Sequence, residues 1–255
     1  MSIVVIIPAR YESKRFPGKP LANISGKPMI EWVIRAACGS KPIEKVIVAT
    51  DDKRIIDFIA DAKLSLPSKH VEAYLTLKDH KCGTDRIAEV VRHQSDIKYI
   101  VNLQGDEPLM PSNYIDKVLE PLLLSKQCSM SSLITPLIIP EDLTNPNIVK
   151  VVMDKNGYAL YFSRSLIPYN RENRRDIQYY RHAGIYAYTR EALLEFSLLP
   201  QSRLEVAEQL EQLRALENGM KIKLEIVPKA YPAVDTPEDI RCVEDLLLNP
   251  HLSSQ

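Results

Sequence analysis

The sequence has no net charge, because its 33 lysines and arginines are balanced by 33 aspartates and glutamates. A balanced chain has no overall positive field, which argues against nucleic acid or an anionic membrane as a partner. No apolar run approaches the roughly 18 residues of a membrane-spanning helix. The first residues also lack the pattern of a signal peptide, so we expect a cytoplasmic protein that does not insert into a membrane.

Several familiar motifs are missing as well. The four cysteines are far apart and show no CxxC spacing, which favours reduced thiols over a zinc site or a disulfide framework. Neither GxGxxG nor GxxxxGK[ST] occurs, so any phosphate site is of another kind. The sequence also shows no internal repeat and no low-complexity tract.

The chain does have enough apolar residues, 45% of 255, to bury a full core. Apolar runs at 3–7, 45–50 and 99–103 alternate with helical repeats, which predicts a parallel sheet flanked by helices. Later, the runs 150–153 and 158–163 flank Asn-Gly, the strongest local signal for a β-hairpin.

We therefore predict an α/β fold with a mixed, mainly parallel sheet and a smaller antiparallel lobe at about residues 140–200. Residues 1–250 are expected to form a single domain, and 251–255 a tail.

Local patterns also predict helix boundaries. Asp51 or Asp52 is expected to cap one helix, and Thr84 or Asp85 the next. Thr236 is expected to cap a helix that has Pro237 at its first position. A further helix is predicted over 204–216, and its polar residues should lie off the buried stripe or at its margins: Glu205, Glu208, Glu211 and Gln212.

The most informative stretch follows the first predicted strand. Four cations, Arg10, Lys14, Arg15 and Lys19, occur within ten residues around it. Charge count alone fits a solvated loop equally well. The position favours an anion site, because ligands of α/β proteins bind at the carboxyl ends of the strands. Gly18 allows a backbone conformation that lets amide groups converge on a phosphate.

Acidic residues follow a later strand. Asp106 lies in the turn Gln104-Gly105-Asp106-Glu107-Pro108, directly after the run 99–103. This placement suits a hard cation that bridges phosphate groups. Asp235 precedes another predicted helix and is equally compatible with an ordinary turn. Spacing alone cannot bring two residues so distant in sequence together.

Eleven short motifs, in order from Ile6 to about Leu248, resemble the 3-deoxy-manno-octulosonate cytidylyltransferase (CMP-Kdo synthetase) family. The motifs include Ile7-Pro8-Ala9-Arg10, Pro17-Gly18-Lys19-Pro20-Leu21, Gly83-Thr84-Asp85-Arg86, Asn102 to Pro108, Asn145-Pro146-Asn147, Tyr161-Phe162-Ser163-Arg164, Arg181-His182, Leu210 to Arg214 and Val234 to Asp239. The sequence departs from the family at Cys82, where Ser is usual, and in a loop at 170–178 that is shorter than in many members.

The resemblance implies a Rossmann-like fold of the nucleotide-diphospho-sugar transferase type, with the lobe used for dimerisation and sugar binding. It also implies a homodimer, Mg²⁺ as cofactor, and transfer of CMP from CTP to Kdo with release of pyrophosphate, for lipopolysaccharide biosynthesis. The implied residues are Pro8, Ala9, Arg10, Arg15, Lys19, Gly83 and Arg86 for CTP; Gln104, Arg164, His182, Tyr186, Glu211 and Gln212 for Kdo; and Asp106 and Asp235 for the metal. Arg10, Lys19, Asp106 and Asp235 would be the catalytic set.

Without the resemblance, simpler interpretations stand beside these. His182 fits a packed histidine and Tyr186 a core residue, whereas Glu211 and Gln212 fit a solvated helix face. Arg164 fits a surface ion pair. The functional alternatives are a cytidylyltransferase for an 8-amino Kdo analogue or a sialic acid, and a homologue that binds CTP without turnover.

Overall fold

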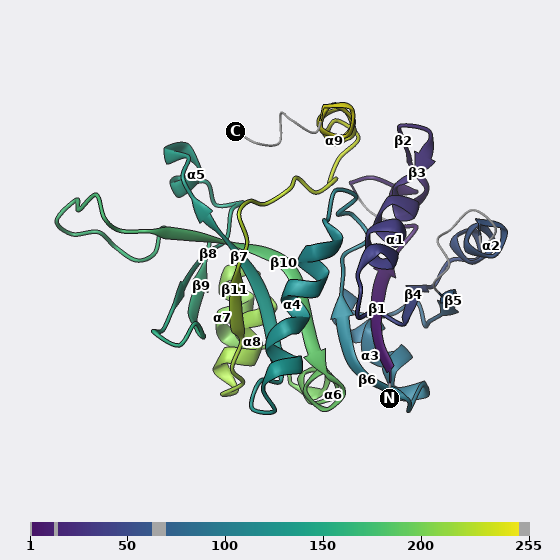
Figure 1. The fold of residues 1–255 in the computed structure, drawn as a ribbon, viewed down its shortest axis with the longest axis horizontal. Helices are drawn as coiled ribbons and strands as arrows, with labels where there is room; N and C mark the ends of the chain where they lie inside the picture. Colours follow the sequence, from purple (N-terminus) through teal and green to yellow (C-terminus); the bar gives the residue numbers. More distant parts are fainter. Residues whose placement is uncertain (1, 13–14, 63–69, 250–255) are drawn as a thin grey trace. The chain divides into compact units, whose positions relative to one another are not determined.

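The computed structural model describes residues 2–12, 15–62 and 70–249, which divide into two compact units (Figure 1). The first unit comprises Met1–Asp116 and Tyr231–Gln255, and the second Lys117–Ala230. The boundary lies within helix α4 (Ser112–Leu124). Lys14 and the predicted tail at 251–255 lie outside the described residues. The single domain 1–250 with a lobe at about 140–200 stays a prediction.

The first unit is built on four parallel strands. They are β1 (Ser2–Ala9), β4 (Lys45–Thr50), β5 (His70–Leu75) and β6 (Ile97–Asn102). Strand β1 lies between β4 and β6, and β5 pairs with the other edge of β4. Residues 4–7 of β1 are fully buried, as expected for a strand covered on both faces.

Helices join these strands in the order that the hydrophobic periodicity predicts. The long ones are α1 (Met29–Gly39), α2 (Lys53–Ala62) and α3 (Gly83–His93), and α9 (Asp239–Leu248) comes at the end of the chain. After β1 come a 3-10 helix, η1 (Lys19–Leu21), and the two short strands β2 (Asn23–Ile24) and β3 (Lys27–Pro28). The alternation of strand and helix confirms the predicted parallel part of the sheet.

The second unit contains most of the antiparallel pairing. Strand β10 (Tyr179–Thr189) runs antiparallel to β7 (Met130–Leu137), and β11 (Lys223–Ile226) runs parallel to β7. Strands β8 (Lys150–Met153) and β9 (Ala159–Ser163) form the predicted hairpin, and its Gly157 has φ 75°. The helices are α5 (Pro140–Thr144), α6 (Arg190–Leu198), α7 (Arg203–Glu208) and α8 (Gln212–Glu217). The mixed, mainly parallel sheet flanked by helices is thereby confirmed.

Two of the three predicted helix caps are wrong. Asp52 does cap α2, since its Oδ1 accepts from Arg54 N at 2.9 Å. Helix α3 begins at Gly83, and the cap is Cys82, whose Sγ accepts from Asp85 N at 3.4 Å. The thiol takes a place that Thr84 or Asp85 was expected to take, because the helix starts one residue before Thr84.

The single helix predicted over 204–216 is two helices. The chain breaks at Gln209, which has φ 53°. Arg214 Nε donates to the buried Glu205 carboxylate at 2.9 Å. In one straight helix of about 3.6 residues per turn, these two side chains would lie on opposite faces. The break lets them pair, and it leaves Glu205 and Gln212 only 6% and 5% exposed, contrary to the expectation for the polar positions.

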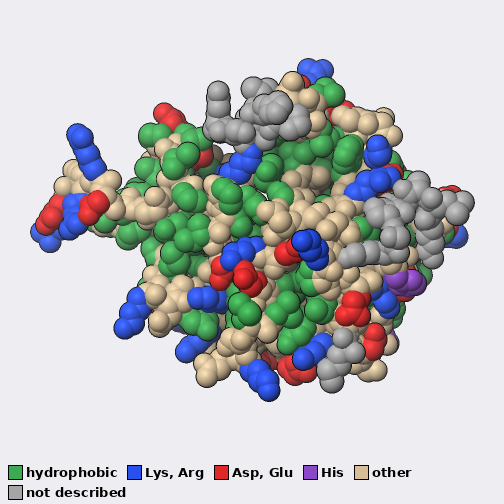
Figure 2. Space-filling model, viewed as in Figure 1, with side chains coloured by type: hydrophobic (Ala, Val, Ile, Leu, Met, Phe, Trp, Pro, Cys, Tyr) green, Lys and Arg blue, Asp and Glu red, His purple; other side chains and the backbone are tan. Residues whose placement is uncertain are grey.

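The described part of the surface shows no segregation of charge by sign on the face that is drawn in Figure 2. On the face shown in Figure 2, basic and acidic side chains lie interspersed. Among the described helices, none is both long and apolar enough to cross a membrane.

Candidate active site

A pocket of about 430 Å³ opens in the first unit, where β1 and β6 end. Its wall is tightly packed at Gly83, where an added Cβ would lie 3.2 Å from the Pro8 side-chain atom Cγ. The pocket also takes in Glu12, which the sequence did not single out. Seven residues expected at the site line it: Pro8, Ala9, Arg10, Lys19, Gly83, Gln104 and Asp106.

The two aspartates that spacing could not connect meet at one ammonium group. Lys19 Nζ donates to Asp106 Oδ2 at 2.7 Å and lies 3.8 Å from Asp235 Oδ1. It also donates to Val234 O at 2.9 Å, while Val234 N donates to Asp106 O at 2.9 Å. Tertiary contacts therefore hold the turn after β6 and the segment before α9 side by side.

Arg15 completes this cluster from the other side. Its Nη2 donates to Asp235 Oδ1 at 2.9 Å. The Arg15 side chain is 67% exposed and that of Lys19 only 14%, so water screens the Arg15 ion pair more strongly. Of these two ion pairs, the one between Lys19 and Asp106 is therefore the stronger restraint.

The position of Asp235 depends on the start of α9. The predicted Thr236 cap is wrong: α9 begins at Asp239, and no side chain of the residue before it caps it. Instead, Asp239 Oδ2 accepts from Asp235 N and from Thr236 N, each at 2.8 Å. Val234 is buried in an apolar cluster with Ile24, Met29 and Val243, and this cluster anchors the segment that carries Asp235.

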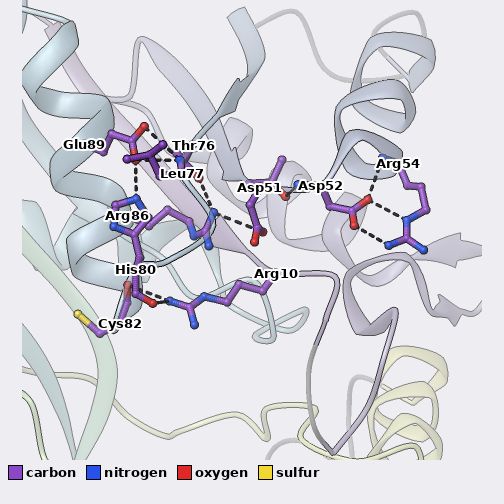
Figure 3. Close-up of polar contacts among 11 residues, drawn as sticks. Arg10, Asp51, Asp52, Arg54, Thr76, Leu77, His80, Cys82, Arg86 and Glu89 are labelled. Atoms are coloured by element: carbon purple, nitrogen blue, oxygen red, sulfur yellow. Dashed lines mark hydrogen bonds and ion pairs between the residues drawn. The ribbon is translucent and has the colours of Figure 1, made fainter.

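Arg10 is held by the segment between β5 and α3 (Figure 3). Its Nη2 donates to His80 O and, at 3.4 Å, to Cys82 O. Glu89 of α3 fixes this segment, because its carboxylate accepts from Leu77 N at 3.1 Å and contacts His80 Nε2. The guanidinium is thus oriented by backbone carbonyls at the wall of the pocket.

Arg86 lies deeper, fully buried between two neighbours (Figure 3). Nη1 donates to Thr76 Oγ1 and lies 3.4 Å from Asp51 Oδ1. Burial lowers the pKa of Arg86, and the Asp51 carboxylate acts in the opposite direction. Nε and Nη2 have no hydrogen-bond partner among the described residues. Buried donors without partners are costly, which favours a polar ligand that uses them.

The other residues expected to bind the sugar belong to the second unit. Strand β10 bulges between Ala183 and Tyr186, where its register against β7 shifts. His182 and Tyr186 oppose Ile134 and Ser132, two residues apart on β7. The bulge therefore places two side chains four apart in sequence next to each other, with ring centroids 5.2 Å apart.

The hydrogen bonds of Ser132 determine the tautomer of His182. Ser132 Oγ donates its only proton to Ile185 O at 2.7 Å, so it accepts from His182 Nε2 at 2.8 Å. Nδ1 then remains as an acceptor. Burial lowers the pKa of His182 to about 3, so the ring is neutral at pH 7. Burial, reinforced by the Glu211 carboxylate, raises the pKa of Tyr186.

Arg164 is not the surface ion pair of the simpler interpretation. Nε donates to Glu208 O at 2.7 Å, Nη1 to Pro146 O at 2.9 Å and Nη2 to Gln209 O at 3.3 Å. Gln212 is buried at the start of α8, so the solvated-face interpretation is wrong for it. Glu211, directly before α8, is half-buried.

Comparison with known proteins identifies the family. The family model for cytidylyltransferases matches residues 4–222. The 3-deoxy-manno-octulosonate cytidylyltransferase of Trichlorobacter lovleyi is 45% identical over 94% of this chain and 96% of its own length. That of Syntrophotalea carbinolica is also 45% identical, over 96% of this chain and 98% of its own length.

A solved structure agrees with these relatives. It is described as CMP:2-keto-3-deoxy-manno-octonic acid synthetase complexed with CTP, and it is 38% identical to this chain. The TM-score is 0.91, over 98% of this chain and 100% of that one. The resemblance found in the motifs is thereby confirmed. The chain belongs to the cytidylyltransferase family of nucleotidyltransferases, and within it to the 3-deoxy-manno-octulosonate cytidylyltransferases.

Proposed function

We propose that this protein transfers CMP from CTP to the anomeric hydroxyl of Kdo, forming CMP-Kdo and releasing pyrophosphate. The observation that carries the proposal is the convergence of Asp106 and Asp235 on Lys19 beside the pocket. Nucleotidyl transfer needs this combination, because cations stabilise charge on the phosphate oxygens and carboxylates hold a divalent metal.

Mg²⁺ is proposed as the cofactor, held by Asp106 and Asp235. Their donor set fits it, since Mg²⁺ is usually bound by one or two carboxylates together with phosphate oxygens. No group of three or more metal-ligating side chains occurs among the described residues, so substrate oxygens would complete the coordination. When bound, Mg²⁺ would supply positive charge near the reacting phosphate.

The protein's own residues would position the reactants. Lys19, Arg15 and Arg10 would bind the triphosphate, and for the first two this means leaving the carboxylates that they contact in the structure. Arg86 would offer its unpartnered Nε and Nη2 to the cytidine, which Pro8, Ala9 and Gly83 would surround. The sugar hydroxyl would then attack the α-phosphorus in line, without a covalent enzyme intermediate.

Kdo would be bound by Gln104, Arg164, His182, Tyr186, Glu211 and Gln212. The Arg164 guanidinium suits a carboxylate, because it can present paired N–H groups. The neutral His182 ring offers Nδ1 as an acceptor for a sugar hydroxyl.

A homodimer, a cytoplasmic location and a role in lipopolysaccharide biosynthesis belong to the same proposal. Exposed apolar side chains in the second unit support dimerisation, among them Ile138 and Tyr169, which are 79% and 85% exposed. Light scattering on the purified protein would test it, and a monomer at assay concentration would contradict it.

The activity itself is tested by incubating the protein with CTP, Kdo and Mg²⁺ and measuring pyrophosphate. Release above a Kdo-free control is expected. No release would overturn the proposed function. Parallel reactions with an 8-amino Kdo analogue and a sialic acid, compared by kcat/KM, test the choice of sugar acid, and a higher value for either would reassign the substrate.

A further inference from the structure

Lys150, at the start of β8, is a fully buried lysine in the second unit. Its Nζ donates to three backbone carbonyls: Asn145 O at 2.6 Å, Ile148 O at 2.9 Å and Arg164 O at 2.9 Å. These contacts use all three of its N–H groups. Among the described residues it takes part in no ion pair within 4 Å.

A buried ammonium without a carboxylate partner is costly, and carbonyl dipoles offset that cost only in part. Burial lowers the pKa of Lys150, the Asp142 carboxylate raises it, and the Arg164 guanidinium lowers it. A methionine of similar length would fill the same space, but it would leave the three carbonyls without a donor. The role of Lys150 is therefore to hold these carbonyls, and apolar packing alone does not explain it.

Two of the three carbonyls bound by Lys150 belong to the motif Asn145-Pro146-Asn147 and to Ile148, the residue after it. The motif forms a tight turn, in which Asn145 Oδ1 accepts from Asn147 N at 2.9 Å and Asn145 O from Ile148 N at 3.2 Å. Pro146 O accepts from Arg164 Nη1 at 2.9 Å. Three carbonyls of one turn thus face two cations. None of the contacts proposed for CTP or Kdo accounts for this motif.

Arg164 links the turn to a second segment. Through Nε and Nη2 it donates to the carbonyls of Glu208 and Gln209, at the break between α7 and α8. The Glu208 carboxylate is engaged elsewhere, accepting from Ser163 Oγ at 2.6 Å and Arg164 N at 2.9 Å. The guanidinium thus donates to the carbonyls of Glu208, Gln209 and Pro146. These three contacts use three of its five N–H groups and leave two for a ligand.

We propose that Lys150 is a positioning residue for the sugar acid. It holds the 145–148 turn and the Arg164 backbone, and it places a fixed positive charge next to the Arg164 carbonyl. This inference rests on the proposed function, since the ligand is a sugar carboxylate bound by Arg164. Lys150 itself has no free donor, so it acts through Arg164 rather than by contact. Loss of Lys150 should weaken binding of the acid and leave CTP binding unchanged.

The test compares Lys150→Met, Lys150→Gln and the control Lys155→Met, which removes an exposed lysine from the turn between β8 and β9. Initial rates are measured against Kdo at saturating CTP and against CTP at saturating Kdo. For Lys150→Met we expect the KM for Kdo to rise about tenfold and the KM for CTP to change less than about twofold. Lys150→Gln, which keeps donors but lacks charge, should lie between Lys150→Met and wild type, and Lys155→Met should match wild type.

Equal changes in both KM values, or an unchanged KM for Kdo in both Lys150 variants, would overturn the inference. Thermal unfolding is recorded for each variant, and Lys150→Gln carries the test if Lys150→Met does not fold. If neither folds while Lys155→Met does, Lys150 serves the fold alone and the inference is overturned. A wild type without Kdo-dependent pyrophosphate release overturns the proposed function as well, whereas an active wild type with unchanged Lys150 variants overturns only this inference.

Discussion

Two pairs of cations, one pair in each unit, are held in opposite ways. In the first, Lys19 and Arg15 are paired with the carboxylates of Asp106 and Asp235. In the second, Lys150 and Arg164 bind backbone carbonyls, and neither is in an ion pair with any described residue. A cation paired with a carboxylate has its charge neutralised locally, so it must exchange partners to bind an anionic ligand. A cation held by neutral carbonyls has no such neutralising partner. The first arrangement suits joint binding of a metal and a polyphosphate, and the second suits a single carboxylate.

The largest effect is expected from removing a carboxylate of the ion-paired cluster in the first unit. Asp106→Asn should lower turnover about 10²-fold or more and leave CTP binding detectable, because metal charge is needed most in the transition state. Steady-state rates and calorimetry with CTP measure the two quantities. Asp61→Asn, on the exposed surface of α2, is the control. Near-normal turnover would remove Asp106 from the mechanism.

Removing the carbonyl-held cation should affect the other substrate. Arg164→Met should raise the KM for Kdo about 30-fold, because hydrogen bonds to a charged group contribute roughly 1.5–3 kcal/mol. The KM for CTP should stay within about twofold. Arg174→Met, which removes an exposed arginine paired with Asp176, should match wild type. Equal increases in both KM values would show that Arg164 does not discriminate between the substrates.

The exchange of partners at Lys19 is testable without turnover. Lys19→Met removes the ammonium group that lies 2.7 Å from Asp106 and 3.8 Å from Asp235. Because a competing cation is lost, Mg²⁺ should bind the CTP-free protein about tenfold more tightly. Calorimetric titration with Mg²⁺ alone measures this affinity, and Lys41→Met, at an exposed site of the same unit, is the control. An unchanged or weaker affinity would mean that Lys19 does not compete with the metal.

The last prediction concerns the pH dependence of stability. The pKa of His182 is lowered to about 3, so between that value and about 6.5 the unfolded chain binds a proton that the folded chain does not. Stability should therefore fall as pH falls below about 6.5, by at most about 1.4 kcal/mol per pH unit from this residue. His182→Gln should flatten the slope of urea-unfolding free energy against pH. Parallel slopes for wild type and His182→Gln would contradict the assignment.

Much of the fold could be predicted because its signals are local. The strand Lys45–Thr50 and the hairpin of β8 and β9 lie where the local sequence patterns predicted them. The cap of α3 and the break at Gln209 could not be predicted. The cap changes identity when the helix begins a single residue earlier, and local propensity does not set the first residue that accurately. The break at Gln209 accompanies the buried pair of Glu205 with Arg214, which forms only when the two segments pack together.

The candidate site divides in the same way. The cations from Arg10 to Lys19 and the acidic turn at Asp106 can be recognised in the sequence, because charged residues directly follow apolar strands there. Lys150 was missed, because a lysine at the start of a strand is ordinary in sequence and only burial makes it unusual. Asp235 was found through the family motifs and not through spacing.

The sequence by itself determined the order of strands and helices, the basic loop, the acidic turn and the family to which the chain belongs, since each is written in residues close together. Only the tertiary structure brought Asp235 to the ammonium that Asp106 binds, and only it placed Lys150 behind Arg164. These arrangements depend on contacts between distant segments, whose geometry comes from packing and backbone hydrogen bonds rather than from any local pattern.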